Sequence, residues 1–159
     1  MRVTVISIGK VREKYIKLGV DEFSKRLSRY CNLEFIEVND EKIGPNPTER
    51  EAEIVRKKEA DLVLSKIKDS MYVVAMDLDG KMMNSEDLAK RVKYIATYQK
   101  SHIAFVIGGS LGLSNLVKAR ADLKLSFSKM TFPHQLFKLL LLEQIYRAFK
   151  INNNEVYHK

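Results

Sequence analysis

Hydrophobic positions along the chain alternate between short, strand-like runs and longer stretches with helical spacing. Apolar and β-branched residues fill five short runs, which we expect to be strands: residues 2–8, 33–38, 72–78, 102–107 and 123–127. The second run alternates apolar with acidic residues, which is typical of a half-exposed strand at the edge of a sheet. The fourth run is continuously apolar and predicts the most buried strand.

Helical periodicity fills the segments between these runs. We expect helices over residues 13–30 and 48–66, from about residues 85 and 114, and over 133–151. Thr48 and Glu51 have the spacing of a capping box, in which each side chain accepts a hydrogen bond from the backbone amide of the other, so the second helix should begin there. The apolar side of the first helix is expected to contain Tyr15, Leu18, Phe23 and Leu27.

This alternation predicts the fold class. Strands separated by helices predict an α/β fold, with a mostly parallel sheet that carries helices on both faces. A chain of 159 residues has the length of one domain. Ligands of open parallel sheets bind at the carboxyl ends of the strands, so we expect the functional site at that edge.

Composition adds a partner class to this picture. Hydrophobic residues make up 45% of the chain and charged residues 30%, which excludes a disordered or fibrous protein. The 28 Lys and Arg against 20 Asp and Glu give a net charge of +8. Basic proteins accumulate at polyanions because neutralised phosphates release counterions, so nucleic acid is the leading partner class. No apolar run approaches a membrane span and the first residues open a strand, so we expect a cytoplasmic protein with no membrane partner.

Cysteine and histidine exclude two further kinds of site. The single cysteine, Cys31, excludes an internal disulfide and a clustered thiolate metal site, and is expected to be a half-buried structural residue. The histidines His102, His134 and His158 show no ligand spacing. We therefore expect no metal.

Two polar turns follow the last two predicted strands. The first, GGSLG at residues 108–112, lacks the Lys-Ser/Thr of a P-loop and does not fit G-x-G-x-x-G, which disfavours those nucleotide-binding classes. Its glycines allow either close approach to a ligand or a plain tight turn. The second turn, residues 126–132, offers hydroxyls and amides ahead of a helix that begins at Pro133. It can surround an adenine or a ribose, or simply cap the helix.

The last predicted helix is apolar around most of its circumference, whereas a lone surface helix carries one apolar stripe. We therefore expect it to pack on a second subunit as well. Glu143 and Arg147 lie four residues apart on its polar stripe, where they can form an ordinary ion pair or where Arg147 can contact substrate. The tail after it has no periodicity and is either mobile or, through Tyr157 and Lys159, able to stack on an RNA base and pair with phosphate.

These segments together resemble the RlmH family. The resemblance is carried by FVIGGSxG at 105–112, LSxSKMTFPHQ at 125–135, EQxYRA at 143–148 and YHK at 157–159, with IGK at 8–10 and LDGK at 78–81. It covers essentially the whole chain and is highly specific. It implies a single domain, residues 1–159, of the SPOUT class of S-adenosylmethionine-dependent methyltransferases, whose parallel sheet ends in a C-terminal trefoil knot that binds the methyl donor.

The resemblance also implies an activity and its residues. The family acts as a homodimer without a separate RNA-binding domain, and methylates N3 of a pseudouridine in a loop of large-subunit ribosomal RNA on assembled ribosomes. Carried over position by position, it implies that S-adenosylmethionine is surrounded by Met76, Gly108, Phe127, Ser128, Lys129, Met130, Thr131 and Phe132. The residues that would face the target base are Arg147, Tyr157, His158 and Lys159.

The implied chemistry agrees with the residues present. N3 of a uracil-type ring carries a proton near neutral pH, and His158 is the natural base because its unperturbed pKa is about 6.5. Arg147 can stabilise the developing anion. Two departures from the family are noted: Met76 replaces the more usual leucine, and Asn153-Asn154 stand where the family often has Arg-Gly. Neither removes a group with obvious chemistry, but the second bears on how the tail folds.

Two other functions remain open at this point. One is a non-catalytic, ribosome-associated RNA-binding protein that keeps the fold and binds the donor without turnover. The other is a knotted methyltransferase that acts on transfer RNA, which differs in the RNA that becomes labelled.

Overall fold

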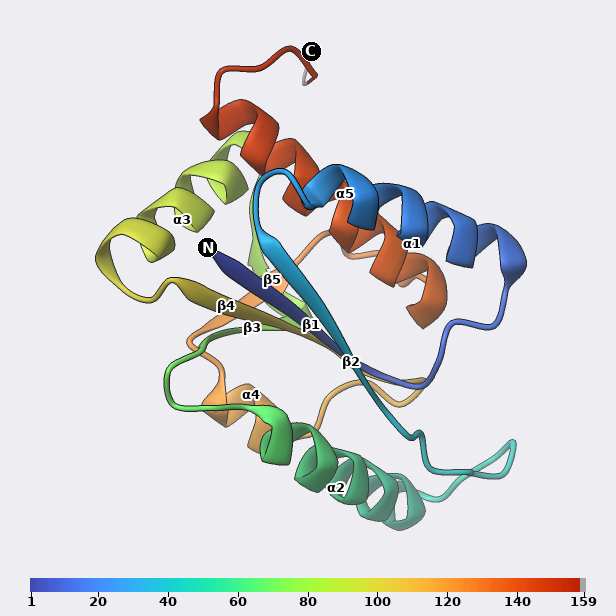
Figure 1. Ribbon diagram of the computed structural model, residues 1–159. Coiled ribbons are helices and arrows are strands. Elements are labelled where there is room, and N and C mark those ends of the chain that lie inside the picture. The colour runs from blue at the N-terminus through green and yellow to red at the C-terminus, as the bar shows by residue number, and fades with distance from the viewer. Residues whose placement is uncertain (158–159) are drawn as a thin grey trace.

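Five parallel strands form one sheet in the order β2-β1-β4-β3-β5 in a computed structural model that describes residues 1–157 (Figure 1). The strands are β1 (Arg2–Ile8), β2 (Asn32–Val38), β3 (Tyr72–Met82), β4 (His102–Ile107) and β5 (Leu123–Ser126). Parallel neighbours need crossover connections, and helices supply them: α1 (Lys14–Leu27), α2 (Glu49–Lys66), α3 (Ser85–Tyr98), α4 (Asn115–Arg120) and α5 (His134–Asn152). The predicted α/β class is confirmed.

The sheet separates two apolar layers. Helices α1, α3 and α5 cover one face, and α2 and α4 cover the other (Figure 1). Strand β2 lies at an edge, and every residue of β4 after His102 is buried, as the sequence predicts. The capping box is also present: Thr48 Oγ1 accepts from the Glu51 amide at 3.2 Å, and Glu51 Oε2 accepts from the Thr48 amide at 3.1 Å.

Strand β3 runs further than predicted. The sequence predicts a turn at Asp79-Gly80, but the strand continues to Met82 with a register shift in which Met76 and Lys81 both face Leu125 of β5. The crossing is close, because a Cβ atom at Gly80 would lie 2.7 Å from the Leu125 backbone nitrogen. Pairing with a neighbouring strand therefore overrides the local turn signal.

The predicted apolar side of α1 is partly wrong. Tyr15 and Leu18 are 64% and 61% exposed, whereas Ile16, Val20 and Leu27 are buried. Residues 16, 20 and 27 share one face at helical spacing, and that face packs on the sheet and α5. The helix thus carries apolar residues on two sides, and only one side is covered within the chain.

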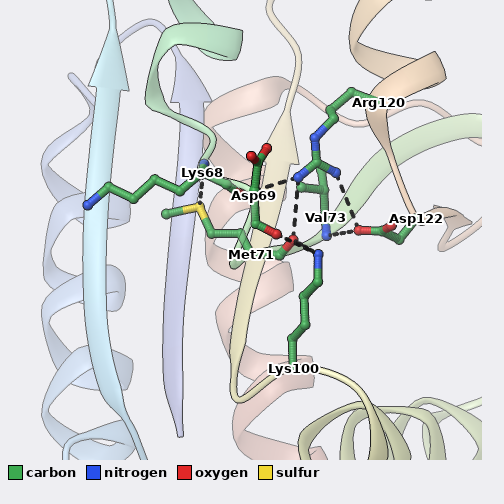
Figure 2. A network of polar contacts seen from close by, with 7 residues as sticks. All are labelled: Lys68, Asp69, Met71, Val73, Lys100, Arg120 and Asp122. Carbon is green, nitrogen blue, oxygen red and sulfur yellow. Dashed lines mark hydrogen bonds and ion pairs between the residues drawn. The ribbon is translucent and has the colours of Figure 1, made fainter.

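Two cations, Lys100 and Arg120, hold the turn that leads into β3 (Figure 2). Lys100 Nζ donates to the carbonyls of Asp69 and Met71 at 2.7 and 3.0 Å. The Arg120 guanidinium donates to the carbonyls of Lys68 and Met71 at 3.2 and 3.5 Å. The turn before β3 is therefore anchored from both α4 and the segment that precedes β4.

Replacing Asp122 with alanine is expected to lower the free energy of unfolding by about 1–3 kcal/mol, because a buried donor would lose its acceptor. Asp122 Oδ2 accepts from the Val73 amide at 2.8 Å, and the Asp122 amide donates to the Val73 carbonyl at 2.8 Å. Val73 is fully buried, and the Asp122 carboxylate is the acceptor of its amide. Urea denaturation measures the change. Asp122→Asn keeps an acceptor oxygen and should lose much less; an equal loss would assign the stability to the ion pair with Arg120 instead.

Candidate functional site

One cavity of about 160 Å³ opens at the carboxyl edge of the sheet, between the ends of β3, β4 and β5 and the beginning of α5. The loops after β4 and β5 form most of its rim. Its apolar wall comes from Met76, Leu125, Phe132 and Phe137. The Phe137 ring lies 5.0 Å from Phe127 and 6.2 Å from Phe132, centroid to centroid, so three aromatic rings form one part of the wall.

The loop after β4 depends on glycine at two positions. A Cβ atom at Gly108 would lie 2.8 Å from the carbonyl carbon of Gly112 and 3.0 Å from its oxygen. Gly112 has a φ of 76°, in the left-handed region, and its amide donates to the Gly109 carbonyl at 3.1 Å. The segment is therefore a tight turn, and it also lines the cavity.

Helix α2 supports this loop from the opposite face. Arg56 Nη1 donates to the Leu111 carbonyl at 3.4 Å. Glu59, which is only 4% exposed, accepts from the Glu41 amide at 3.2 Å, and its Oε2 would lie 3.6 Å from a Cβ atom at Gly109. Burial raises the pKa of Glu59. Side chains of α2 therefore pack against the glycine turn and support it.

The loop after β5 is shaped by its own serines. Ser126 Oγ donates to the Ser128 carbonyl at 2.9 Å, and Ser128 Oγ accepts from the Met130 amide at 2.9 Å. These local bonds fix the backbone that follows β5. The loop lines the cavity with both apolar and hydroxyl-bearing residues, a combination that is typical of small-molecule sites.

Most of the residues predicted to hold the donor meet at this cavity. Its lining includes Met76, Gly108, Phe127, Ser128, Met130, Thr131 and Phe132. Lys129 belongs to the same loop but is exposed and is not among the lining residues.

Two polar lining residues were missed by the sequence analysis. Asp77 pairs with Lys118 Nζ at 3.4 Å and accepts from the Asp79 amide at 3.2 Å. His134, the first residue of α5, lines the cavity close to Gly9. Asp77 stands next to a segment that carries the family resemblance, and His134 stands within one, so these segments were the available signal.

A second polar group gathers around Glu143 of α5. Arg147 Nη2 and Nε donate to Glu143 Oε1 at 2.5 and 3.1 Å, and the Tyr157 hydroxyl donates to the same oxygen at 3.0 Å. Arg147 Cζ also lies 4.8 Å from the centroid of the Tyr157 ring. The bond to Glu143 raises the pKa of Arg147, and burial together with that carboxylate raises the pKa of Tyr157, so both stay protonated at neutral pH. His158 and Lys159 lie outside the described residues.

Arg147 and Tyr157 do not line the first cavity. A second, neighbouring cavity connects the residues of the first cavity with the polar group around Glu143. Phe127 lines both cavities, and Glu143 lines the second. Gln144 extends the network: its Nε2 donates to Glu143 Oε2 at 2.8 Å and its Oε1 accepts from Ser85 Oγ at 2.8 Å. The polar chain thus runs from the beginning of α3 across α5 to the tail.

Two further expectations from the sequence concern metal ligands and the single cysteine. Among residues 1–157, no group of three or more His, Cys, Asp or Glu is placed to hold a metal ion. Cys31 is half-buried, as expected, and burial raises its pKa to about 11. Within the same range, no helix has both the length and the apolar character to cross a membrane.

Sequence comparison finds close relatives along the full chain. A family model described as "Predicted SPOUT methyltransferase" matches residues 1–158. The "Ribosomal RNA large subunit methyltransferase H" of Clostridium novyi (strain NT) is 57% identical over 159 residues, which are 100% of both chains. The protein of the same name from Clostridioides difficile (strain 630) is 55% identical over the same full coverage.

Structural comparison agrees with the fold. The crystal structure of tRNA (m1G37) methyltransferase from Aquifex aeolicus matches with a TM-score of 0.54 and 13% identity, over 92% of this chain and 70% of that one. A probable methylase family protein from Haemophilus influenzae Rd KW20 matches with a TM-score of 0.52 and 15% identity, over 99% and 70%. At such low identity the likeness shows the shared fold alone.

Proposed function

The chain belongs to the SPOUT methyltransferase family, and from this premise we propose that it transfers a methyl group from S-adenosylmethionine to large-subunit ribosomal RNA. The observation that carries the proposal is its 55–58% identity, over the full length, to proteins named Ribosomal RNA large subunit methyltransferase H. We extend the proposal to N3 of a pseudouridine as the acceptor and to the assembled ribosome as the substrate, which the family resemblance implies.

The lining of the cavity at the carboxyl edge supports binding of the donor there. Gly108 lets the turn close tightly against Gly112 beside the cavity, and the lining combines apolar and aromatic side chains with Ser126, Ser128 and Thr131. S-adenosylmethionine, when bound, supplies a methyl group activated by the sulfonium. Met76, Gly108 and the loop 127–132 would hold it, and the trefoil knot expected of the family would comprise the two loops.

The group around Glu143 would serve the acceptor. N3 of the target ring must lose its proton before its lone pair can form the new N–C bond, and we assign that proton to His158. The bond between the methyl carbon and the sulfonium sulfur would break as the N–C bond forms, and the sulfur would leave as a neutral thioether. Arg147 stays cationic and would stabilise the negative charge that develops on the ring. Tyr157 stays a neutral phenol, so its proposed role is contact with the base rather than proton removal.

We propose a homodimer as the acting form. Helix α1 leaves Tyr15 and Leu18 exposed, and many apolar side chains of α5 are only half-buried within the chain. Exposed apolar surface of this kind marks interaction sites. A dimer would cover it and would widen the basic surface offered to ribosomal RNA, for which the net charge of +8 is suited.

The test is a transfer assay with methyl-labelled S-adenosylmethionine. Intact ribosomes, free large-subunit RNA and transfer RNA are taken from a strain that lacks its own enzyme of this activity, and the label is mapped by mass spectrometry. Label at N3 of one pseudouridine, obtained with ribosomes, is expected. Label in transfer RNA would favour the other substrate class, and donor binding without any label would favour a non-catalytic RNA-binding protein.

A further inference from the structure

Helix α5 ends in a turn that reverses the chain towards its own last turn. Asn154 has a φ of 55°, in the left-handed region. Its amide donates to the Ile151 carbonyl at 3.1 Å, and the Glu155 amide donates to the Lys150 carbonyl at 2.9 Å. These two bonds form a Schellman motif, whose left-handed position takes glycine and sometimes asparagine. Asn154 therefore preserves the backbone path that glycine would give.

The side chain that follows this turn is anchored at once. Glu155 Oε2 accepts from Lys150 Nζ at 2.5 Å and from the Tyr30 hydroxyl at 2.8 Å. In many Schellman motifs the two residues at the positions of Lys150 and Glu155 make a hydrophobic contact. In this chain they form an ion pair instead. The hydrogen bond from Lys150, and to a smaller extent the one from Tyr30, lowers the pKa of Glu155, so Glu155 is a carboxylate at neutral pH.

Tyr30 connects the anchored tail to the end of α1. Its ring stacks on Phe149 at 5.7 Å with an interplanar angle of 18°, and meets Tyr146 edge-on at 6.0 Å. Tyr146 in turn meets the Tyr157 ring edge-on at 5.0 Å. One aromatic cluster therefore joins the segment after α1, helix α5 and the tail, and it includes Tyr157.

We propose that Tyr30, Lys150 and Glu155 form a tail clamp, a set of positioning residues that holds Tyr157 beside Arg147 for methyl transfer. The proposal rests on the proposed function. Tyr157 follows Glu155 by two residues, a span of at most about 7 Å, so fixing Glu155 narrows the positions that Tyr157 can reach. Glu155 accepts from Lys150 and Tyr30, whereas Arg147 pairs with Glu143, so the clamp and the group that would face the base are built on different carboxylates.

The test compares Glu155→Ala, Tyr30→Phe and the double variant with the wild-type protein. Both single variants are expected to lower kcat for ribosome methylation about tenfold, which corresponds to about 1.4 kcal/mol, and to leave the affinity for S-adenosylmethionine unchanged. The double variant should be no slower than Glu155→Ala, because both changes remove the same bond. Glu155→Gln should recover part of the rate, since its amide oxygen still accepts from Tyr30.

A control variant and a measurement of tail order distinguish the possible outcomes of this test. Asp61→Asn changes one exposed carboxylate of α2, on the other face of the sheet, and should keep the wild-type rate. Hydrogen exchange at the Glu155 amide reports whether the tail is still held. Wild-type kcat in Glu155→Ala with a released tail would overturn the clamp, and so would losses that multiply in the double variant. A wild-type protein that labels no RNA would instead overturn the proposed function.

Discussion

Replacing Gly108 with alanine is expected to weaken the binding of S-adenosylmethionine about a hundredfold, which is about 2.7 kcal/mol. The new Cβ atom would meet the carbonyl carbon of Gly112 at 2.8 Å and its oxygen at 3.0 Å. Both are backbone atoms, so no side chain can rotate away, and the turn at residues 108–112 must open. That turn borders the cavity proposed for the donor. Isothermal titration calorimetry measures the affinity directly.

A matched glycine separates this effect from a general effect of added bulk. A Cβ atom at Gly44 would have no heavy atom within 4 Å, so Gly44→Ala should bind the donor as the wild-type protein does. Thermal unfolding of both variants shows whether each is folded at the temperature of the titration. If folded Gly108→Ala binds with wild-type affinity, the turn is not part of the donor site.

The sequence predicts the secondary structure well where the signals are local. Thr48 and Glu51 form their capping box, and Asn84 caps α3 by accepting from the Asp87 amide, because such bonds involve only neighbouring residues. The prediction fails at Asp79-Gly80, where pairing with β5 extends the strand through a turn signal. That outcome depends on a strand more than forty residues away, which no local pattern contains.

In the candidate site, too, local contacts could be predicted from the sequence and contacts between distant segments could not. Glu143 and Arg147 form the ion pair that was one of the two possibilities left open by the sequence, since residues four apart share a helix face. The meeting of Tyr157 with Glu143 could not be predicted, because it depends on the Schellman turn and on Tyr30. The polar group around Glu143 lies apart from the first cavity, and Phe127 lines both this cavity and the second one. This arrangement follows from the packing of α5 and not from any spacing in the sequence.

Replacing Arg147 with alanine is expected to lower kcat for ribosome methylation about 10²–10³-fold and to leave donor affinity unchanged. The proposed reaction places negative charge on the target ring, and Arg147 supplies a permanent cation that Glu143 orients through two hydrogen bonds to one oxygen. The residue does not line the first cavity, so its loss should not alter donor binding. Single-turnover transfer with saturating donor measures the chemical step.

Two conservative variants decide how Arg147 acts. Arg147→Lys keeps the charge but loses the planar fork, so a rate between those of wild type and Arg147→Ala would show that charge and orientation both contribute. Glu143→Gln keeps an oxygen that accepts from Arg147 and Tyr157 but removes the opposing charge. If Glu143 only orients the guanidinium, this variant should lose less activity than Arg147→Ala. If instead Arg147→Ala weakens donor binding while kcat at saturating donor is unchanged, Arg147 belongs to the donor site and the anion on the base is stabilised by another group.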